Sequence, residues 1–414
     1  MATAARGAGV ARVARHTLTV KILHVYKDYP PILGGIENHV RLLAEGQAAS
    51  GHDVTVLVTN PKGTHTIVSI ENGVRVIRAG RLATVASAPL SLALPWQLLH
   101  QRPDVVHLHF PYPVGEVSQW LLRRGRATVL TYHSDVVRQA GILRFYRPLL
   151  ARILHSVDAI IIGSPPMAGS TYLAAHQAKL HLIPYGIPLA RFQAAPAAAD
   201  LARVRAHYLP DISPALPLPH SPLPPRPSAP LLLFVGRLRY YKGLDTLIRA
   251  LPDIPARLLV VGIGPLEGEW RALAQEAGVA GRVAWLGEVP DVDLPALYHL
   301  ADLFVLPGSH PSEAFGLVQV EAMAAGLPVI CTELGTGTSY VNRDGVTGLV
   351  VPPRDPTALA AAINRLLADP DLRARMGAAA RARVAAEFDL DVMIDRVLEL
   401  YRLVCATDSS SQCR

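Results

Sequence analysis

Two glutamates around one predicted helix form the pattern in this sequence with the clearest chemistry. Glu313 precedes a helix expected to begin near Phe315 and Gly316, and Glu321 lies on that helix. The free amides of Phe315, Gly316 and Leu317 at its N-terminus would attract an anion. The carboxylates would accept hydrogen bonds from sugar hydroxyls on either side. The alternative is a surface carboxylate and a second that faces its own helix.

Two cations follow the first predicted strand of the same half. Gly236 ends the strand, and Arg237 and Lys242 come before the next helix. A guanidinium fork and a compact ammonium both suit phosphate, although two solvated surface charges are the alternative. A turn containing Gly262 and Gly264 follows the next strand, and it fits either a close approach to a nucleotide or a structural turn. These residues predict a site for a diphosphate.

The first half offers two weaker candidates. Gly34 and Gly35 stand where a strand turns into a helix, so their amides could face an anion, or they could form a tight turn with positive φ. His133 ends another strand, and Ser134 and Asp135 could orient it. There it would hydrogen-bond sugar hydroxyls or exchange a proton, unless it is a satisfied core histidine.

We expect no metal site. His107 and His109 share one face of a strand, but no third ligand lies at a suitable spacing, so packing or pocket lining is the default. Asp291 and Asp293 resemble a metal-binding pair. Pro290 before them and an apolar helix after them favour a helix N-cap instead.

Strands that alternate with helices must position these residues. Amphipathic helices are predicted at 36–49, 244–251 and 266–278 between short apolar runs. The predicted strands are 18–25, 54–58, 74–78, 105–109, 128–132, 159–162, 180–183, 231–235, 257–261, 283–286, 303–306, 329–331 and 349–351. This pattern predicts an α/β protein with two doubly wound, Rossmann-like domains facing a central cleft.

A proline-rich stretch at 194–230 separates the two halves, and we expect it to be an irregular linker. Residues 372–404 read as two helices whose break lies near Phe388, followed by a polar tail that we expect to be disordered. The predicted organisation is a Rossmann-like domain at 18–190, the linker at 191–230, a second Rossmann-like domain at 231–387, and a helix at 388–406 that could cross back to the first domain.

Composition narrows the class of protein. The 414 residues are 50% hydrophobic, and the net charge of +7 is concentrated in the first half without a dense basic run, so we expect no nucleic-acid partner. Three cysteines, no secretory signal and no bilayer-spanning run predict a cytoplasmic protein. Residues 142–155 mix arginines with apolar side chains. They could touch an anionic membrane peripherally or simply pack on the sheet.

The motif at 313–330 resembles the signature of the retaining family-four glycosyltransferases, which have the GT-B fold. The two glycine turns and the Gly236–Lys242 segment follow in that family's order, so the resemblance covers roughly residues 18–404. Residues 24–37 and 333–353 are similar to bacterial rhamnosyl- and mannosyltransferases. The resemblance implies that the first domain, 18–190, lies on the acceptor side and that the second, 231–387, binds the nucleotide-sugar. Gly335–Tyr340 departs from the family, because the carboxylate usual in that turn is absent.

The resemblance implies a role for each position. Arg237 and Lys242 would hold the donor phosphates, Glu321 the ribose, and Glu313 the transferred sugar. His133 would lie beside the reacting sugar, and the Gly34–Gly35 turn near the phosphates or acceptor. The family needs no metal and no cofactor beyond its nucleotide-sugar co-substrate.

The implied function is transfer of a hexose, mannose or rhamnose, from a nucleotide-sugar to a glycan or lipid-linked acceptor. Because no second carboxylate is an obvious nucleophile, we expect a front-face displacement with retention. A nucleotide-sugar epimerase of the same architecture and a non-catalytic sugar-nucleotide-binding protein are the alternatives.

Overall fold

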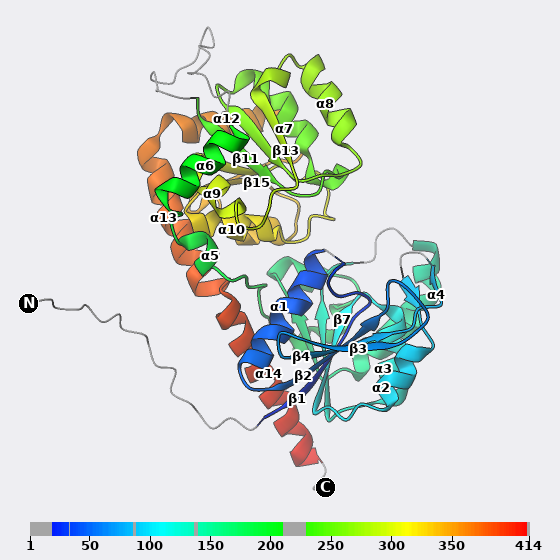
Figure 1. The fold of residues 1–414 in the computed structure, drawn as a ribbon. Helices are drawn as coiled ribbons and strands as arrows, with labels where there is room; N and C mark the ends of the chain where they lie inside the picture. Colours follow the sequence, from blue (N-terminus) through cyan, green and yellow to red (C-terminus); the bar gives the residue numbers. More distant parts are fainter. Residues whose placement is uncertain (1–18, 33, 86–87, 136–139, 210–228, 412–414) are drawn as a thin grey trace, which may run out of the picture.

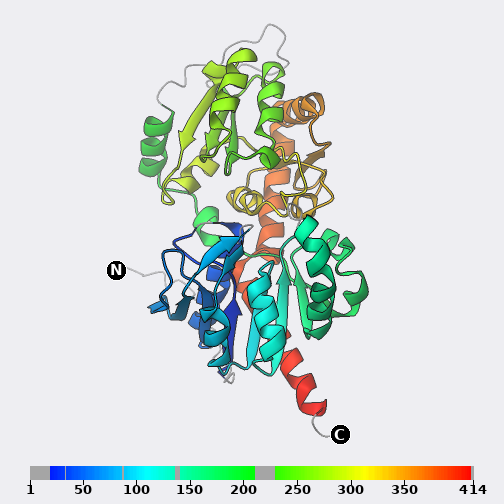
Figure 2. The same ribbon diagram turned by 90° about the vertical axis from the view of Figure 1, so that its right-hand side faces the viewer.

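The computed structural model describes the chain except for residues 1–18, 33, 86–87, 136–139, 210–228 and 412–414. Two mostly parallel sheets lie one above the other, and helices cover both faces of each (Figure 1; Figure 2). The predicted fold class of two facing doubly wound layers is therefore confirmed.

The first sheet has the strand order β10-β9-β8-β7-β1-β2-β4-β3, with β3 antiparallel to β4. Its strands are β1 (Lys21–Val25), β2 (Asp53–Thr59), β3 (Ile67–Glu71), β4 (Val74–Ala79), β7 (Val105–Phe110), β8 (Ala127–Tyr132), β9 (Ala159–Ile162) and β10 (Leu180–Leu182). Strands β5 (Ala83–Val85) and β6 (Ala88–Leu90) form a separate antiparallel ribbon. The sequence predicted every parallel strand here. It missed β3, β5 and β6, which lack long apolar runs.

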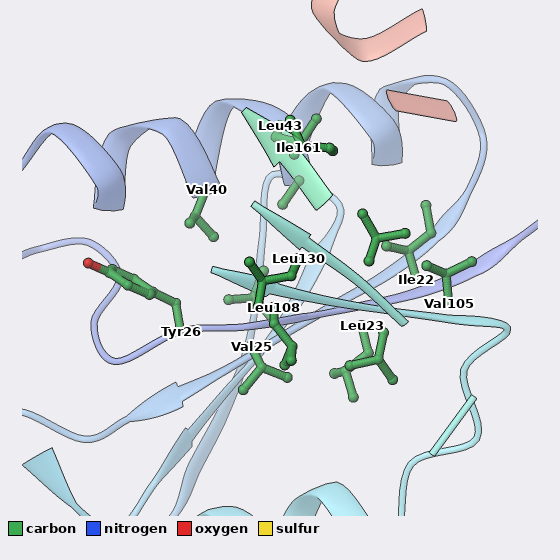
Figure 3. Close-up of a cluster of buried hydrophobic side chains, with 14 of the residues drawn as sticks. Ile22, Leu23, Val25, Tyr26, Val40, Leu43, Val105, Leu108, Leu130 and Ile161 are labelled. Atoms are coloured by element: carbon green, nitrogen blue, oxygen red, sulfur yellow. The ribbon is translucent and has the colours of Figure 1, made fainter. Parts of the chain in front are cut away.

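Helices α1 (Gly35–Ala49) and α14 (Leu390–Ser411) cover one face of this sheet, and α2 (Ala93–Leu99) and α3 (Pro113–Leu122) pack against the other. Helix α4 (Ala140–Ser156) lies against α3. Figure 3 shows the core between α1 and the strands, where Val40 and Leu43 point down onto the central strands. Buried aliphatic side chains on both faces hold these strands in place, as parallel sheets require.

The second sheet is entirely parallel, in the order β13-β12-β11-β14-β15-β16. Its strands are β11 (Leu231–Val235), β12 (Arg257–Val261), β13 (Val283–Gly287), β14 (Leu303–Leu306), β15 (Val329–Thr332) and β16 (Gly348–Val351). Its helices are α7 (Leu244–Ala250), α8 (Glu267–Glu276), α9 (Leu294–Leu300), α10 (Leu317–Ala325), α11 (Gly337–Val341), α12 (Pro356–Ala368) and α13 (Pro370–Glu387).

Each sheet has one point where the strand order reverses. In the first sheet the chain leaves β1 toward β2 and later returns to β7 on the other side. In the second it leaves β11 toward β12 and returns to β14. Loops at the carboxyl ends of such neighbouring strands separate and leave a crevice for ligands. The fold therefore provides two such points.

The end of the chain returns to the first sheet. Helix α14 follows α13 after a break at Phe388, and both were expected there. Met393, Val397 and Tyr401 of α14 are buried in the first sheet's core. The predicted disorder of the polar tail is wrong as far as Ser411, because α14 continues to that residue; Cys413 lies outside the described residues.

The linker prediction was partly wrong. Residues 194–230 were expected to hold no helix, yet α6 (Ala198–Tyr208) lies within them, after the short α5 (Ala190–Gln193). This stretch carries no proline or glycine between Pro196 and Pro210, so nothing interrupts its helical hydrogen bonds. Val204 of α6 is fully buried where α6 packs on α9. The most proline-rich part, 210–228, lies outside the described residues.

Candidate active site

A buried ion pair lies at the reversal point of the second sheet. Lys242 ends a single 3-10 turn after β11, and Glu313 lies in the loop after β14. Lys242 Nζ lies 2.7 Å from Glu313 Oε2, with the two side chains 11% and 7% exposed. Neighbouring strands β11 and β14 bring these loops together, and Ser309 N donates to the carbonyl of Tyr241 at 2.9 Å. The sequence predicted both residues but not their pairing.

Gly236 and Arg237 lie beside this pair. Gly236 leaves β11 with φ +156°, and a Cβ there would come 3.3 Å from Lys242 Nζ. Arg237, the next residue, is exposed. The predicted cations therefore differ: Lys242 is buried and paired, and Arg237 faces solvent.

The second glycine turn packs against the first. A Cβ on Gly262 would lie 2.2 Å from the carbonyl oxygen of Gly236, and one on Gly264 would lie 2.4 Å from that of Leu238. Leu238 N also donates to Ile263 O at 3.0 Å. This close approach of two backbones accounts for both glycines, and contact between Gly264 and a nucleotide stays a prediction.

The N-terminus of α10 opens beside Glu313. Gly316 occupies the N-cap in the left-handed region, with φ +73°, and its missing side chain makes room for Leu306 and Gln319. The helix begins at Leu317, one residue later than expected, and its first amides have no partner within the helix. Phe315 is buried, so it can offer an anion only its amide.

Glu321 lies further along α10, where Tyr298 holds it. The Tyr298 hydroxyl donates to Glu321 Oε2 at 2.7 Å. Burial raises the pKa of Glu321 to about 7, and the charges of Arg191 and Lys242 act in the opposite direction. Lys242 thus lies within electrostatic reach of both glutamates.

The turn that departs from the family pattern supports the Glu313 loop. Thr336 Oγ1 donates to the carbonyl of Glu313 at 2.9 Å, and Gly337 N donates to Ala314 O at 2.7 Å. Nearby, Glu333 Oε1 accepts from Gly335 N at 2.8 Å. Backbone and hydroxyl contacts therefore hold the segment on which Glu313 stands.

In the first sheet, Gly34 and Gly35 follow β1 and start α1. Gly34 is extended, with φ −174°, so the tight turn with positive φ is wrong. A Cβ on Gly34 would lie 2.2 Å from Glu37 Oε2, whereas one on Gly35 would meet nothing within 4 Å. A side chain at Gly34 would therefore displace the carboxylate of the buried Glu37 side chain.

His133 lies at the end of β8, as predicted, but its partners are different. Its Nδ1 lies 3.0 Å from the hydroxyl of Tyr185, and its Nε2 lies 3.2 Å from Nδ1 of His109. Asp135, which was expected to orient it, instead accepts from the hydroxyl of Tyr132 and from Ser170. The expectation is corrected because Asp135 is held away by these two hydroxyls.

Tyr185 connects the two halves. Its ring lies 4.8 Å from that of Phe315, just before α10, while its hydroxyl bonds to His133. Sequence reasoning missed Tyr185, which stands in a connection between strands with no motif around it. This contact places His133 on the side of the first domain that faces the α10 N-terminus.

His107 and His109 share one face of β7, as predicted, and their rings stack 4.4 Å apart. The structure adds buried histidines that sequence spacing did not connect: His24 of β1 lies opposite His107, and His39 comes from α1. Two groups have ring nitrogens within 4.8 Å of one another: His24, His107 and His109, and His39, His109 and His133. The third nitrogen that the spacing of His107 and His109 could not supply therefore comes from neighbouring elements of the fold.

The two aspartates bind arginines. Asp293 holds the N-cap position of α9, as expected, but its carboxylate does not cap the helix. It accepts from Arg203 at 2.6 Å and from the Tyr208 hydroxyl at 3.2 Å, both on α6. Asp291 lies 3.4 Å from Arg191. Because helix α6 was not predicted, these contacts of the Asp293 carboxylate were not predicted either.

Comparison with known proteins gives matches along most of the chain. Residues 33–191 match the family model described as Glycosyltransferase Family 4, and residues 220–383 match Glycosyl transferases group 1. O-antigen chain mannosyltransferase C of Escherichia coli is 36% identical over 394 residues, covering 94% of this chain and 100% of that protein. D-rhamnosyltransferase WbpZ of Pseudomonas aeruginosa is 37% identical over 369 residues, covering 88% and 91%. The structure of sucrose-phosphate synthase from Thermosynechococcus elongatus superposes with a TM-score of 0.73 at 28% identity, covering 93% of this chain and 99% of that one.

Proposed function

The chain belongs to glycosyltransferase family 4 and is a glycosyltransferase of GT-B type, and from that premise we propose that it transfers mannose or rhamnose from a nucleotide-sugar to a glycan or lipid-linked acceptor. The similarity to a mannosyltransferase of the O-antigen chain and to a D-rhamnosyltransferase supports this choice of sugar. The name of the first relative, a mannosyltransferase of the O-antigen chain, supports a glycan acceptor.

The observation that carries the proposal is the Lys242–Glu313 pair beside the α10 N-terminus. A donor diphosphate at this helix end would meet free amides, the ammonium of Lys242 and the exposed guanidinium of Arg237. Glu313 would accept from hydroxyls of the sugar, and Glu321 from the ribose. These groups would stabilise the charge that develops on the leaving diphosphate.

Retention of configuration is part of the proposal. Glu313 is held by Lys242, and an ion-paired carboxylate is a poor nucleophile, which supports front-face displacement. The acceptor oxygen would bond to the anomeric carbon while the bond to the diphosphate breaks on the same face, and a diphosphate oxygen would take the acceptor's proton. The anomeric configuration of the product, measured by NMR, tests this; an inverted product contradicts it.

Independence of divalent metal is proposed as well. Arg237 and Lys242 would offset the donor's charge that a metal balances in other sugar transferases. We expect full activity after treatment with EDTA and no stimulation by added Mg²⁺ or Mn²⁺. Loss of activity on chelation, restored by one of these ions, would contradict the proposal.

The donor is best identified by thermal shift. A ligand that binds only the folded chain raises its melting temperature. We expect GDP-mannose or a nucleotide-activated rhamnose to give a larger shift than UDP-sugars. Turnover of that donor should require an added acceptor, whereas an epimerase would consume it alone.

Peripheral contact with an anionic membrane is proposed for presenting a lipid-linked acceptor. Among the residues described, every helix is too short or too polar to cross a bilayer. In α4, Leu150, Ile153 and Leu154 are buried, so the described part of its apolar surface packs inward. Leu92 and Trp96, at and within α2, are instead 76% and 61% exposed. Replacing both with serine should weaken sedimentation with anionic vesicles; unchanged sedimentation would exclude this surface.

A further inference from the structure

Five histidines are buried close together in the first domain: His24, His39, His107, His109 and His133. Burial lowers the pKa of His24 to about 4 and that of His39 to about 3, and lowers the pKa values of the other three as well. A neutral imidazole carries one N–H and one lone pair. Each ring can therefore donate on one side and accept on the other.

A single line of hydrogen bonds runs through three of these rings, from Gln47 of α1 to Tyr185. Gln47 Oε1 lies 2.7 Å from His24 Nε2. His24 Nδ1 lies 3.1 Å from His109 Nε2, and His109 Nδ1 lies 3.2 Å from His133 Nε2. His133 Nδ1 lies 3.0 Å from the hydroxyl of Tyr185. Because each ring donates once and accepts once, every bond in the line must point the same way.

The amide of Gln47 sets that direction. Its carbonyl oxygen can only accept, so His24 carries its proton on Nε2, and each following ring then does the same. We infer that Gln47 is a positioning residue which, through His24 and His109, holds His133 with its proton on Nε2 and its Nδ1 lone pair toward Tyr185. The inference rests on the proposed function: a donor or acceptor hydroxyl that displaces Tyr185 would meet a lone pair.

The same amide anchors a second line that does not include His133. Gln47 Nε2 donates to the hydroxyl of Tyr401 at 3.4 Å, and that hydroxyl lies 2.5 Å from His107 Nδ1. His107 Nε2 lies 2.6 Å from Thr131 Oγ1, which is buried. Tyr401 is therefore a matched control, because removing its hydroxyl alters this second line and leaves the bonds to His133 in place.

A metal ion would require a different arrangement of protons. His39, His109 and His133 have ring nitrogens within 4.8 Å, and neither ring nitrogen of His39 has a hydrogen-bond partner in the described chain. An ion on His109 Nδ1 and His133 Nε2 would take the two nitrogens that share the 3.2 Å bond and would displace its proton. A metal and the line of hydrogen bonds cannot coexist at this position.

The test uses the full chain with ¹⁵N in its imidazole rings. Two-bond proton–nitrogen NMR spectra identify the protonated nitrogen of His133, whose signals are assigned by their loss in His133→Asn. We expect the proton on Nε2 in the natural chain and in Tyr401→Phe, and a mixture or reversal in Gln47→Met. If Gln47→Met does not fold, His24→Leu interrupts the same line one bond further on.

Turnover gives a second readout. With the donor found by thermal shift, Gln47→Met should lower kcat roughly five- to tenfold and change KM little, because the free energy of about one hydrogen bond is lost. Tyr401→Phe should leave kcat and KM unchanged. A proton on Nδ1 of His133 in the natural chain, an unchanged tautomer in Gln47→Met, or one bound metal per purified chain would overturn the inference. The spectra need no substrate, so a failure of the proposed function would not affect them.

Discussion

The two reversal points of the sheets have the same topology and opposite chemistry. Between β1 and β7 the interior is neutral, with His24 and His107 in register on adjacent strands. Between β11 and β14 the loops hold a buried ammonium and carboxylate, Lys242 and Glu313. The same strand arrangement therefore supports either kind of site, and the difference comes from the side chains placed there.

The contrast teaches how each half tolerates polar groups in its interior. Burial favours the neutral form of an imidazole, and His24, His109 and His133 satisfy one another by hydrogen bonds, which needs no counter-charge. A buried ammonium keeps its charge only beside a carboxylate. In our proposal the charged point receives the donor diphosphate and the neutral point faces the sugar and acceptor hydroxyls. Each of the following predictions breaks or sharpens that contrast.

The largest effect is expected on turnover at the charged point. Replacing Arg237, Lys242 or Glu313 singly by alanine should lower kcat at least about a hundredfold, because each would remove charge stabilisation from the transition state. Steady-state transfer assays measure this. Near-normal activity in all three variants would refute the assignment of the site.

The stability of the charged point should depend on both partners. Lys242→Met leaves the Glu313 carboxylate buried and unpaired, and should lower the free energy of unfolding by about 3 kcal/mol. Lys242→Met combined with Glu313→Leu should recover most of that loss without restoring activity. Urea unfolding of both variants measures the difference; a double variant no more stable than the single one would contradict it.

A buried carboxyl in the first domain should make stability depend on pH. Glu116 accepts from Tyr112 N at 2.5 Å and from the Tyr146 hydroxyl, and burial raises its pKa to about 7. A raised pKa means that the folded chain binds the proton more tightly than the unfolded chain. This contribution, about 3 kcal/mol, is complete below about pH 4.5 and is lost as pH rises through about 7.

Glu116→Gln isolates this contribution, because the amide keeps the size of the side chain and does not titrate. Urea unfolding at pH 5 and pH 8 should show the natural chain losing more stability than the variant between these two values. An equal loss in both proteins would assign the pH dependence to other groups.

The smallest effect concerns the turn before α10. Gly316→Ala forces an alanine to φ +73° and places its Cβ 2.7 Å from Leu306 Cδ2, which should cost about 1 to 2 kcal/mol of stability. The control is Gly268→Ala within α8, where a Cβ meets nothing within 4 Å and should stabilise by roughly 0.5 to 1 kcal/mol. Thermal unfolding measures both; equal shifts would show that Gly316 is not constrained.

Much of the site could be predicted because its residues follow strands directly. Arg237 and Lys242 come after β11 and Glu313 after β14, and carboxyl ends of parallel strands meet at one edge. The pairing of Lys242 with Glu313 could not be predicted, because side-chain geometry depends on how two loops pack. The N-cap position of Asp293 was predicted, but its carboxylate binds Arg203 of α6, a helix between prolines that the sequence analysis did not predict.

By itself the sequence determined the parallel strands, the two layers and the positions of Arg237, Lys242 and Glu313 at strand ends, because apolar runs and glycine turns act locally. Only the tertiary structure decided which side chains meet. Gln47 and His24 come from α1 and β1, His109 from β7 and Tyr185 from the connection after β10, and only the folded chain joins them to His133. Hydrogen-bond direction and burial depend on these long-range neighbours, which no local pattern records.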